Sequence, residues 1–185
     1  MITREEALKL LREHVKGENM IKHCLASEAV LGALAKRLGE DEAKWALAGL
    51  LHDVDVEVTN ADPAVHGAKA AEILRPAGVP EDVIEAIRMH NEKSSGARRC
   101  DRFHRALAAG ETITGLVVAA TLVYPDKKLA SVKPNSVVKR MKEKLFAASV
   151  DRDIIRECEA IGIPLPDFAQ LAVEAMRAVS SELGL

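Results

Sequence analysis

The residues best suited to chemistry stand in the stretch AGLLHDVDVEV, residues 48–58. There an apolar helical run ends in His52 and Asp53, and a further acid follows at Asp55. Burying an imidazole beside a carboxylate is costly unless another group pairs with them. A divalent metal ion is the usual partner of such a mixture of ligands. The stretch therefore predicts part of a metal site, and other parts of the chain must supply the remaining ligands.

Four more residues of ligand type follow one another along the chain. His23 lies early in a predicted helix, His66 opens another, His90 closes a third, and Glu111 lies within a long one. A lone histidine on a helix is more often structural or solvated than a ligand. Here, however, nearly every helix predicted from the second to the sixth carries one such residue. In an antiparallel bundle, side chains from separate helices can converge on one cavity. We therefore expect these four residues to meet the His-Asp pair.

The elements that must position these residues are helices, because apolar residues recur with helical periodicity along most of the chain. We expect helices over about 3–17, 20–38, 41–53, 64–78, 80–92, 101–123, 134–146, 151–160 and 166–183. Thr3 with Glu6 predicts a capping box at the first, and Asn19 is a candidate cap of the second. Residues 54–63 are polar and β-branched and are expected to form a loop. No segment predicts a strand, so the fold class is all-α.

The composition is that of an ordinary globular protein. The chain has 185 residues, 48% of them hydrophobic and 3% aromatic, with a net charge of -2. This length fits one domain with a core of aliphatic helix faces. The three cysteines include no CxxC pair, which argues against a thiolate zinc site and a disulfide framework, and Cys24 is expected to be buried. The first 17 residues do not form a signal peptide or membrane span, so we expect a cytoplasmic protein.

The order of the candidate ligands resembles that of the HD-domain (HDIG-type) metal-dependent phosphohydrolases. The similarity covers about residues 20–125, and LAGLLHDVD matches the apolar helix, the His-Asp pair and the following acid of that family. It implies an all-α HD-domain helical bundle with a C-terminal helical extension. Residues 1–125 would form the metal-binding core with its N-terminal helix. Residues 126–185 would pack on this core within a single structural domain.

The resemblance also implies the roles of the site residues. One divalent metal would be held by His23, His52, Asp53 and the late acid, Glu111. A second metal, where the family binds one, would add His66 and His90, with Asp53 bridging the ions. Asp53 would also orient the attacking hydroxide. His66 or His90, where not bound to metal, would contact the phosphate or protonate the leaving oxygen, which makes these three the candidate catalytic residues.

One position departs from the pattern of the family. Its last ligand is usually an aspartate, often after an alanine, whereas this chain has Glu111 after Gly110. Glutamate reaches one methylene further and can still ligate a metal, but it can also alter the geometry or mark a site that binds metal weakly. Asp101 is the nearby alternative, and it stands too early, at the start of the predicted helix.

A divalent metal with an open coordination position lowers the pKa of bound water and polarises a phosphoryl oxygen. Mixed His and carboxylate ligation suits Mn, Fe, Co, Ni or Zn, with one or two ions per chain. Phosphate substrates also need nearby cations. Residues 127–144 hold seven lysines and arginines against one acid, and Lys127, Lys128 and Lys139 are the candidates for contacting a substrate phosphate.

The partner expected from these features is a small phosphorylated substrate, possibly a nucleotide. Without clustered aromatic residues for base stacking, nucleic acid is disfavoured. The composition indicates no membrane partner. The last predicted helix carries enough apolar residues to pack on the bundle or on a second copy, which leaves a homo-oligomer open.

Three functions remain open from the sequence. The first is a metal-dependent phosphohydrolase, a phosphomonoesterase or phosphodiesterase acting on a nucleotide or other small phosphoester. The second is an HD-fold diiron oxygenase, because His66 and His90 fit a diiron site as well as a hydrolytic one. The third is a non-catalytic HD-domain ligand-binding module, which the departure at Glu111 favours.

Overall fold

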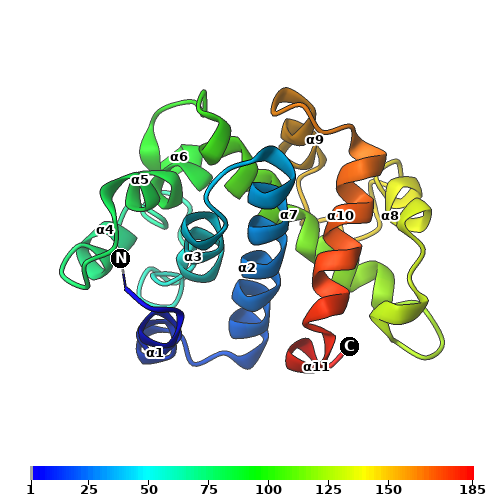
Figure 1. Cartoon of the computed structure of the whole chain (residues 1–185), viewed down its shortest axis with the longest axis horizontal. Helices are drawn as coiled ribbons and strands as arrows, with labels where there is room; N and C mark the ends of the chain where they lie inside the picture. Colours follow the sequence, from blue (N-terminus) through cyan, green and yellow to red (C-terminus); the bar gives the residue numbers. More distant parts are fainter. Residues whose placement is uncertain (1) are drawn as a thin grey trace.

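The computed structural model describes residues 2–185 and contains helices but no strands in that part of the chain (Figure 1). The elements, in chain order, are α1 (Arg4–His14), α2 (Glu18–Leu38), α3 (Glu42–Leu51), α4 (Ala70–Leu74), α5 (Glu81–His90), α6 (Glu92–Ser95), α7 (Arg102–Leu122), the 3-10 helix η1 (Leu129–Ser131), α8 (Pro134–Arg140), α9 (Arg152–Ala160), α10 (Leu165–Ala178) and α11 (Ser180–Leu183). The all-α prediction is confirmed, and the architecture is consistent with an HD-domain helical bundle.

The two longest helices, α2 and α7, form the centre of the molecule. α2 packs against α3, α7 and α10, and α7 also packs against α5 and α9. Figure 1 shows α1 and α3–α6 on one side of this pair and α8–α10 on the other. The core between them is almost entirely aliphatic, as the low aromatic content predicts. The C-terminal helices thus pack on the core, while the division at residue 125 stays a prediction.

Two glycines let α3 and α7 approach α2 closely. A Cβ atom at Gly49 would lie 2.6 Å from the carbonyl oxygen of Ser27, and one at Gly110 would lie 2.5 Å from Leu31 Cδ2. Neither separation is possible in a close-packed interior. A side chain at Gly49 would meet the α2 backbone and push α3 away, whereas one at Gly110 would force the Leu31 side chain to move. Gly49 stands three residues before His52, and Gly110 directly precedes Glu111. The close helix contacts therefore lie directly beside the candidate site.

Of the two predicted helix caps, one is found in the structure and the other is not. The capping box of Thr3 and Glu6 is confirmed, since each side chain accepts a hydrogen bond from the backbone N–H of the other. The prediction for Asn19 is wrong, because α2 begins at Glu18 with Gly17 as its cap. The Glu57 carboxylate accepts the backbone N–H groups of Lys16 and Gly17, both at 2.8 Å. A side chain 40 residues away thus fixes the start of α2.

The helix predicted over residues 64–78 is much shorter in the structure. Residues 52–69 form consecutive turns, and only Ala70–Leu74 is regular helix. Gly67 has a φ of 87°, and its N–H donates to Asp55 Oδ2 at 2.8 Å. A positive φ breaks the helical path, and the N–H is no longer free to continue it. The helical periodicity of residues 64–78 therefore predicts a helix that is too long, because it takes no account of the hydrogen bond between the Gly67 N–H and the Asp55 carboxylate.

Three smaller boundaries also differ from the prediction. The helix expected to reach residue 146 ends at Arg140, and the last helix divides at Val179 into α10 and α11. The short helix α6 covers residues 93–95, for which no helix was predicted, in addition to Glu92. These differences lie at the edges of the bundle, where local turns compete with short helical segments.

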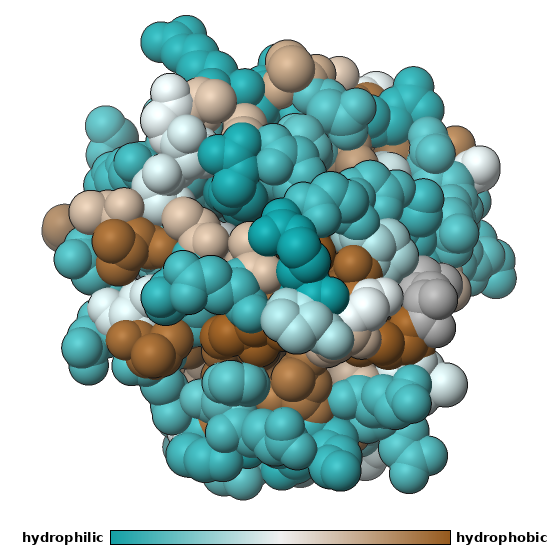
Figure 2. All heavy atoms as spheres, turned by 90° about the vertical axis from the view of Figure 1, so that its left-hand side faces the viewer, coloured by the Kyte–Doolittle hydropathy of each residue, from teal (hydrophilic) through white to brown (hydrophobic). Residues whose placement is uncertain are grey.

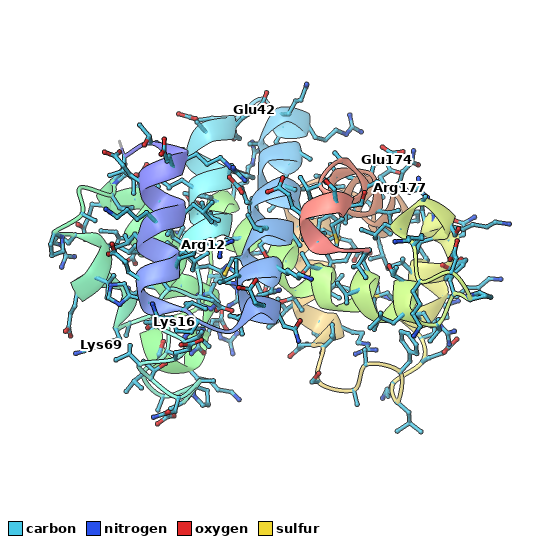
Figure 3. All side chains as sticks on the ribbon, turned by 90° about the horizontal axis from the view of Figure 1, so that it is seen from below. Arg12, Lys16, Glu42, Lys69, Glu174 and Arg177 are labelled. Atoms are coloured by element: carbon cyan, nitrogen blue, oxygen red, sulfur yellow. The ribbon has the colours of Figure 1, made fainter. Side chains whose placement is uncertain are left out.

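The surface is largely hydrophilic. Figure 2 shows the face formed by α1, α4 and α5, where hydrophilic side chains dominate and apolar groups lie between them. Charged side chains such as Glu42, Lys69 and Glu174 point away from the bundle (Figure 3). By length and composition α7 could cross a membrane, but 61% of its most apolar window is buried inside this protein.

Candidate metal centre

The Asp53 carboxylate lies at the centre of a group of four histidines. Its Oδ2 is 3.4 Å from His52 Nε2 and 3.6 Å from His23 Nε2. Its Oδ1 is 2.9 Å from His66 Nε2 and 3.7 Å from His90 Nε2. The two oxygens therefore face different histidine pairs. We call His23, His52 and Asp53 the first triad, and Asp53, His66 and His90 the second triad.

The spacing within each triad suits one coordination sphere. The Nε2 atoms of His23 and His52 are 3.1 Å apart, and those of His66 and His90 are 3.2 Å apart. Two donors that each lie about 2.1 Å from a tetrahedral ion are about 3.4 Å from each other. The triads are thus groups of donors already close to the separation that a metal ion imposes, and the shared Asp53 would lie between two ions.

The far nitrogen of each imidazole has a partner of its own. Nδ1 of His52 lies 2.8 Å from the carbonyl oxygen of Gly49, and Nδ1 of His90 lies 2.5 Å from that of Ile87. Since a carbonyl only accepts hydrogen bonds, Nδ1 of each ring donates to it, and Nε2 is the nitrogen that faces Asp53. Outer contacts of this kind fix the tautomer and the orientation of metal-binding histidines.

The other two histidines are held by side chains. His23 Nδ1 lies 3.0 Å from Thr114 Oγ1, and that hydroxyl donates to the carbonyl oxygen of Glu111 at 2.6 Å. The hydroxyl oxygen is therefore left to accept from His23, which frees Nε2 for a metal. His66 Nδ1 lies 2.8 Å from Asp55 Oδ1, and Asp55 is fully buried.

Burial and charge set the protonation of the cluster. Burial lowers the pKa of His23 and of His90, each to about 4, so both imidazoles are neutral at pH 7. Burial also lowers the pKa of His66, but Asp53 and Asp55 outweigh it and raise this pKa to about 10. For Asp53, burial raises the pKa while the surrounding histidines, His52 first, bring it well below its ordinary value. A carboxylate anion therefore lies among the imidazoles.

Glu111 reaches the first triad from α7. Its Oε2 lies 3.7 Å from His23 Nε2, and its side chain accepts a hydrogen bond from the hydroxyl of Thr112. Burial raises the pKa of Glu111 to about 7. The longer glutamate side chain thus brings a carboxylate to the place where the family pattern has an aspartate. The structure brings all six expected ligand residues together.

The structure does not bring the three candidate lysines to this cluster. Lys127, Lys128 and Lys139 are exposed, and none of them takes part in an ion pair among residues 2–185. Glu111 and Leu122 are separated by 11 residues of helix, which is about 16 Å at 1.5 Å per residue. Among the described residues no ion pair joins these lysines to the cluster, so their contact with a substrate phosphate stays a prediction.

Three residues that support the cluster were not assigned a role from the sequence. Asp55 belongs to the sequence HDVD, and its position two residues after Asp53 could have indicated that it supports the cluster. Thr114 gave no signal. Arg99 is buried and donates to the carbonyl oxygens of Met89 and His90 at 3.2 and 2.9 Å, while it pairs with Glu157 at 2.6 Å. It therefore holds the end of α5 that carries His90.

The comparisons with known proteins agree with this arrangement. The family model described as HD domain matches residues 20–124. Ribonuclease Y of Nitratidesulfovibrio vulgaris is 36% identical over 75 residues, which are 40% of this chain and 14% of the relative. Ribonuclease Y of Thermus thermophilus is 33% identical over 76 residues, 41% of this chain and 13% of the relative. The chain therefore spans only a small part of the relatives it matches, and no solved structure matches it.

One expectation does not fit the relatives, which match this chain only in part. Nucleic acid was disfavoured as a partner, and relatives named as ribonucleases do not fit that expectation. The family match covers more than half of the chain and includes every residue of both triads. HD domains bind divalent metals, and the cluster of histidines and Asp53 is able to hold one. The chain therefore belongs to the HD domain family, which implies the metal-dependent phosphohydrolase superfamily.

Proposed function

We propose that this protein hydrolyses phosphoesters with divalent metal ions held by the two triads. The observation that carries the proposal is the orientation of Asp53, which turns one oxygen toward each histidine pair. A first ion would be held by His23, His52, Asp53 and Glu111. A second would be held by Asp53, His66 and His90. Ligands of this mixture suit Mn, Fe, Co, Ni or Zn.

Such ions supply a hydroxide at neutral pH and stabilise the attacking and leaving oxygens of an in-line displacement. Asp53 would fix the direction of the attacking oxygen because its own position is set by four imidazoles. The partners of the Nδ1 atoms keep each Nε2 pointed at the centre. In the metal-free protein Glu111, with its pKa raised to about 7 by burial, can hold a proton at neutral pH, which it would release on binding the first ion. With only the first ion present, His66 keeps its proton and would contact the phosphate.

The substrate class is a phosphoester, and a nucleotide or another small ester is the first candidate. RNA is a second candidate, favoured by the ribonuclease names of the relatives. The basic segment, residues 127–144, agrees with it, since its only ion pair joins Arg140 to Glu143. Exposed and unpaired lysines attract a phosphate backbone, and they would contact phosphates remote from the scissile one.

The test is metal content by mass spectrometry on untagged protein prepared without chelators, together with hydrolysis of p-nitrophenyl phosphate, nucleoside monophosphates and oligoribonucleotides. One or two transition-metal ions per chain with hydrolysis of any of these esters would support the proposal. Two irons per chain, visible absorption and oxygen uptake without hydrolysis would favour the diiron oxygenase. No bound metal after reconstitution, and no hydrolysis, would leave a non-catalytic HD module.

A further inference from the structure

Arg99 lies in the connection between α6 and α7, and only 5% of its side chain is exposed. Its guanidinium faces two groups at once. Nη1 donates to the carbonyl oxygens of Met89 and His90 at 3.2 and 2.9 Å. Nε and Nη2 donate to the Glu157 carboxylate, at 3.1 and 2.6 Å. A buried cation therefore joins the end of α5 to the carboxylate of a distant helix.

The carbonyl oxygens that Arg99 binds belong to the last turn of α5. A helix leaves its last carbonyls without an intrahelical donor, so those of Met89 and His90 need partners from elsewhere. Both residues are buried, and a buried carbonyl oxygen is costly to leave unpaired. A cation at the C-terminal end of a helix also interacts favourably with the helix dipole. Arg99 therefore stabilises the last turn of α5.

The last turn of α5 sets the direction of the His90 imidazole. Its Nδ1 donates to the carbonyl oxygen of Ile87, which belongs to the same turn, at 2.5 Å. Its Nε2 then faces Asp53 in the second triad. If this turn frayed, the contact with Ile87 would be lost and the imidazole would be free to leave the second triad. The position of this ligand thus depends on the backbone that Arg99 holds.

The same end of α5 also holds the segment that carries His66. The side-chain amide of Asn91 donates to the carbonyl oxygens of Pro63 and His66, at 2.8 and 2.9 Å. Asn91 directly follows His90, so a displacement of the last turn of α5 would move this amide as well. Both histidines of the second triad are therefore linked to Arg99 by short hydrogen bonds.

Glu157 makes the burial of Arg99 possible. A buried guanidinium without a counter-charge is costly, and Glu157 accepts hydrogen bonds from two of its nitrogens. Glu157 belongs to α9, which packs against α7 (Figure 1). It lies outside residues 20–124, which the HD domain model matches. The C-terminal helices thus supply the charge that keeps Arg99 at the end of α5.

We propose that Glu157 is a positioning residue for the second metal ion and acts through Arg99 and the last turn of α5. This inference rests on the proposed function, because the second triad must hold an ion. Within residues 2–185, no hydrogen bond or ion pair joins Arg99 or Glu157 to His23 or His52. The effect of Glu157 should therefore be confined to the second ion. The C-terminal helices are thereby part of the metal centre.

The test is calorimetric titration of Mn²⁺ into the metal-free full chain at pH 8, where Glu111, with its pKa raised to about 7 by burial, is largely ionised. The second ion is identified as the one whose binding is lost in His90→Ala. Glu157→Gln keeps the size of the side chain but removes the counter-charge of Arg99. We expect this variant to bind the second ion about tenfold more weakly and the first ion as before.

A double variant separates positioning from stability. Glu157→Gln leaves Arg99 buried without a counter-charge, so this variant should also melt at a lower temperature. Replacing both members of a buried ion pair with apolar residues is often neutral, so Arg99→Met with Glu157→Met should recover much of the melting temperature. Its affinity for the second ion should stay at least about tenfold reduced, because the last turn of α5 has lost its donors. A merely structural role would restore the affinity together with the melting temperature.

Glu28→Gln is the matched control, because Glu28 pairs with Arg4 through two hydrogen bonds that involve neither triad. Both ions should bind to this variant as they do to the unmodified protein. The inference alone would be overturned by an unchanged affinity for the second ion in Glu157→Gln, by an equal loss of both ions, or by recovery in the double variant. If the unmodified protein binds no second ion, the inference fails together with the two-ion site of the proposed function.

Discussion

The two triads share Asp53 but are built differently. His23 of the first triad stands on the long helix α2, His52 directly follows α3, and Glu111 approaches from α7. In the second triad, His66 comes from the irregular segment 52–69, and His90 from the end of α5. Packing of regular helices therefore positions the first triad. Specific polar contacts must position His66 of the second.

The two triads also differ in the protonation of their histidines. Burial lowers the pKa of His23 to about 4, so His23 presents a neutral imidazole to the first triad at pH 7. His66 lies between Asp53 and Asp55, and these carboxylates outweigh its burial and raise its pKa to about 10. In the metal-free protein a proton thus stands where the second ion would bind. We conclude that the first triad is prepared for metal and that the second must release a proton.

Asp53→Ala should have the largest effect, because it removes the one ligand common to both triads. We expect the metal content of the purified protein to fall from one or two ions per chain to near zero. Hydrolysis of p-nitrophenyl phosphate should fall by more than the roughly 10–100-fold typical of changes to outer-shell partners. Mass spectrometry and initial rates measure the two effects. Retention of one tightly bound ion would mean that the histidines hold this ion without Asp53.

Asp55→Asn should separate the triads. Asp55 contacts His66 and the N–H of Gly67, and no ion pair joins it to the first triad. We expect the affinity for the second ion to fall about 10–100-fold, with the first ion retained. Thr114→Val, which removes the partner of His23 Nδ1, is the matched change at the first triad. Competition with a chelator measures both, and equal losses of both ions in Asp55→Asn would contradict the division into triads.

The second ion should also bind more weakly as the pH falls. A metal binds neutral imidazole, and His66 has its pKa raised to about 10 by Asp53 and Asp55 despite burial. Below that pH each second ion must displace one proton, so its affinity should fall about tenfold for each pH unit lost. Titration with Mn²⁺ at several pH values measures the slope. In Asp55→Asn the pKa of His66 should fall, and the slope should disappear at the upper end of the range.

The first triad was easier to predict from the sequence than the second. The periodicity that places His23 and Glu111 on helices is a local property, and the His-Asp pair ends a clear apolar run. The second triad depends on the capture of the Gly67 N–H by Asp55, across 12 residues. Periodicity predicted a helix there because it does not register such a contact. Thr114 acts through a hydrogen bond to a residue far away in the sequence, and Arg99 through an ion pair with one, and a single sequence does not reveal such contacts.

The smallest effect is expected for Glu111, the residue that departs from the family pattern. Its carboxylate is 3.7 Å from His23 Nε2, and burial raises its pKa to about 7. If it ligates the first ion, binding must displace its proton below about pH 7 but not above, because His23 is already neutral there. The affinity for the first ion should then be constant above pH 7 and fall toward tenfold per pH unit below it.

Glu111→Gln keeps the size of the side chain but removes the titrating carboxyl. We expect it to lower the affinity for the first ion about tenfold at pH 8. It should also remove most of the pH dependence of that affinity below pH 7. A structural role alone would change the affinity without changing this slope. Glu111→Asp, which restores the residue type of the family, should keep a slope but shift its midpoint, because the shorter side chain places the carboxyl differently. An unchanged slope in Glu111→Gln would show that Glu111 lies beside the first ion without binding it.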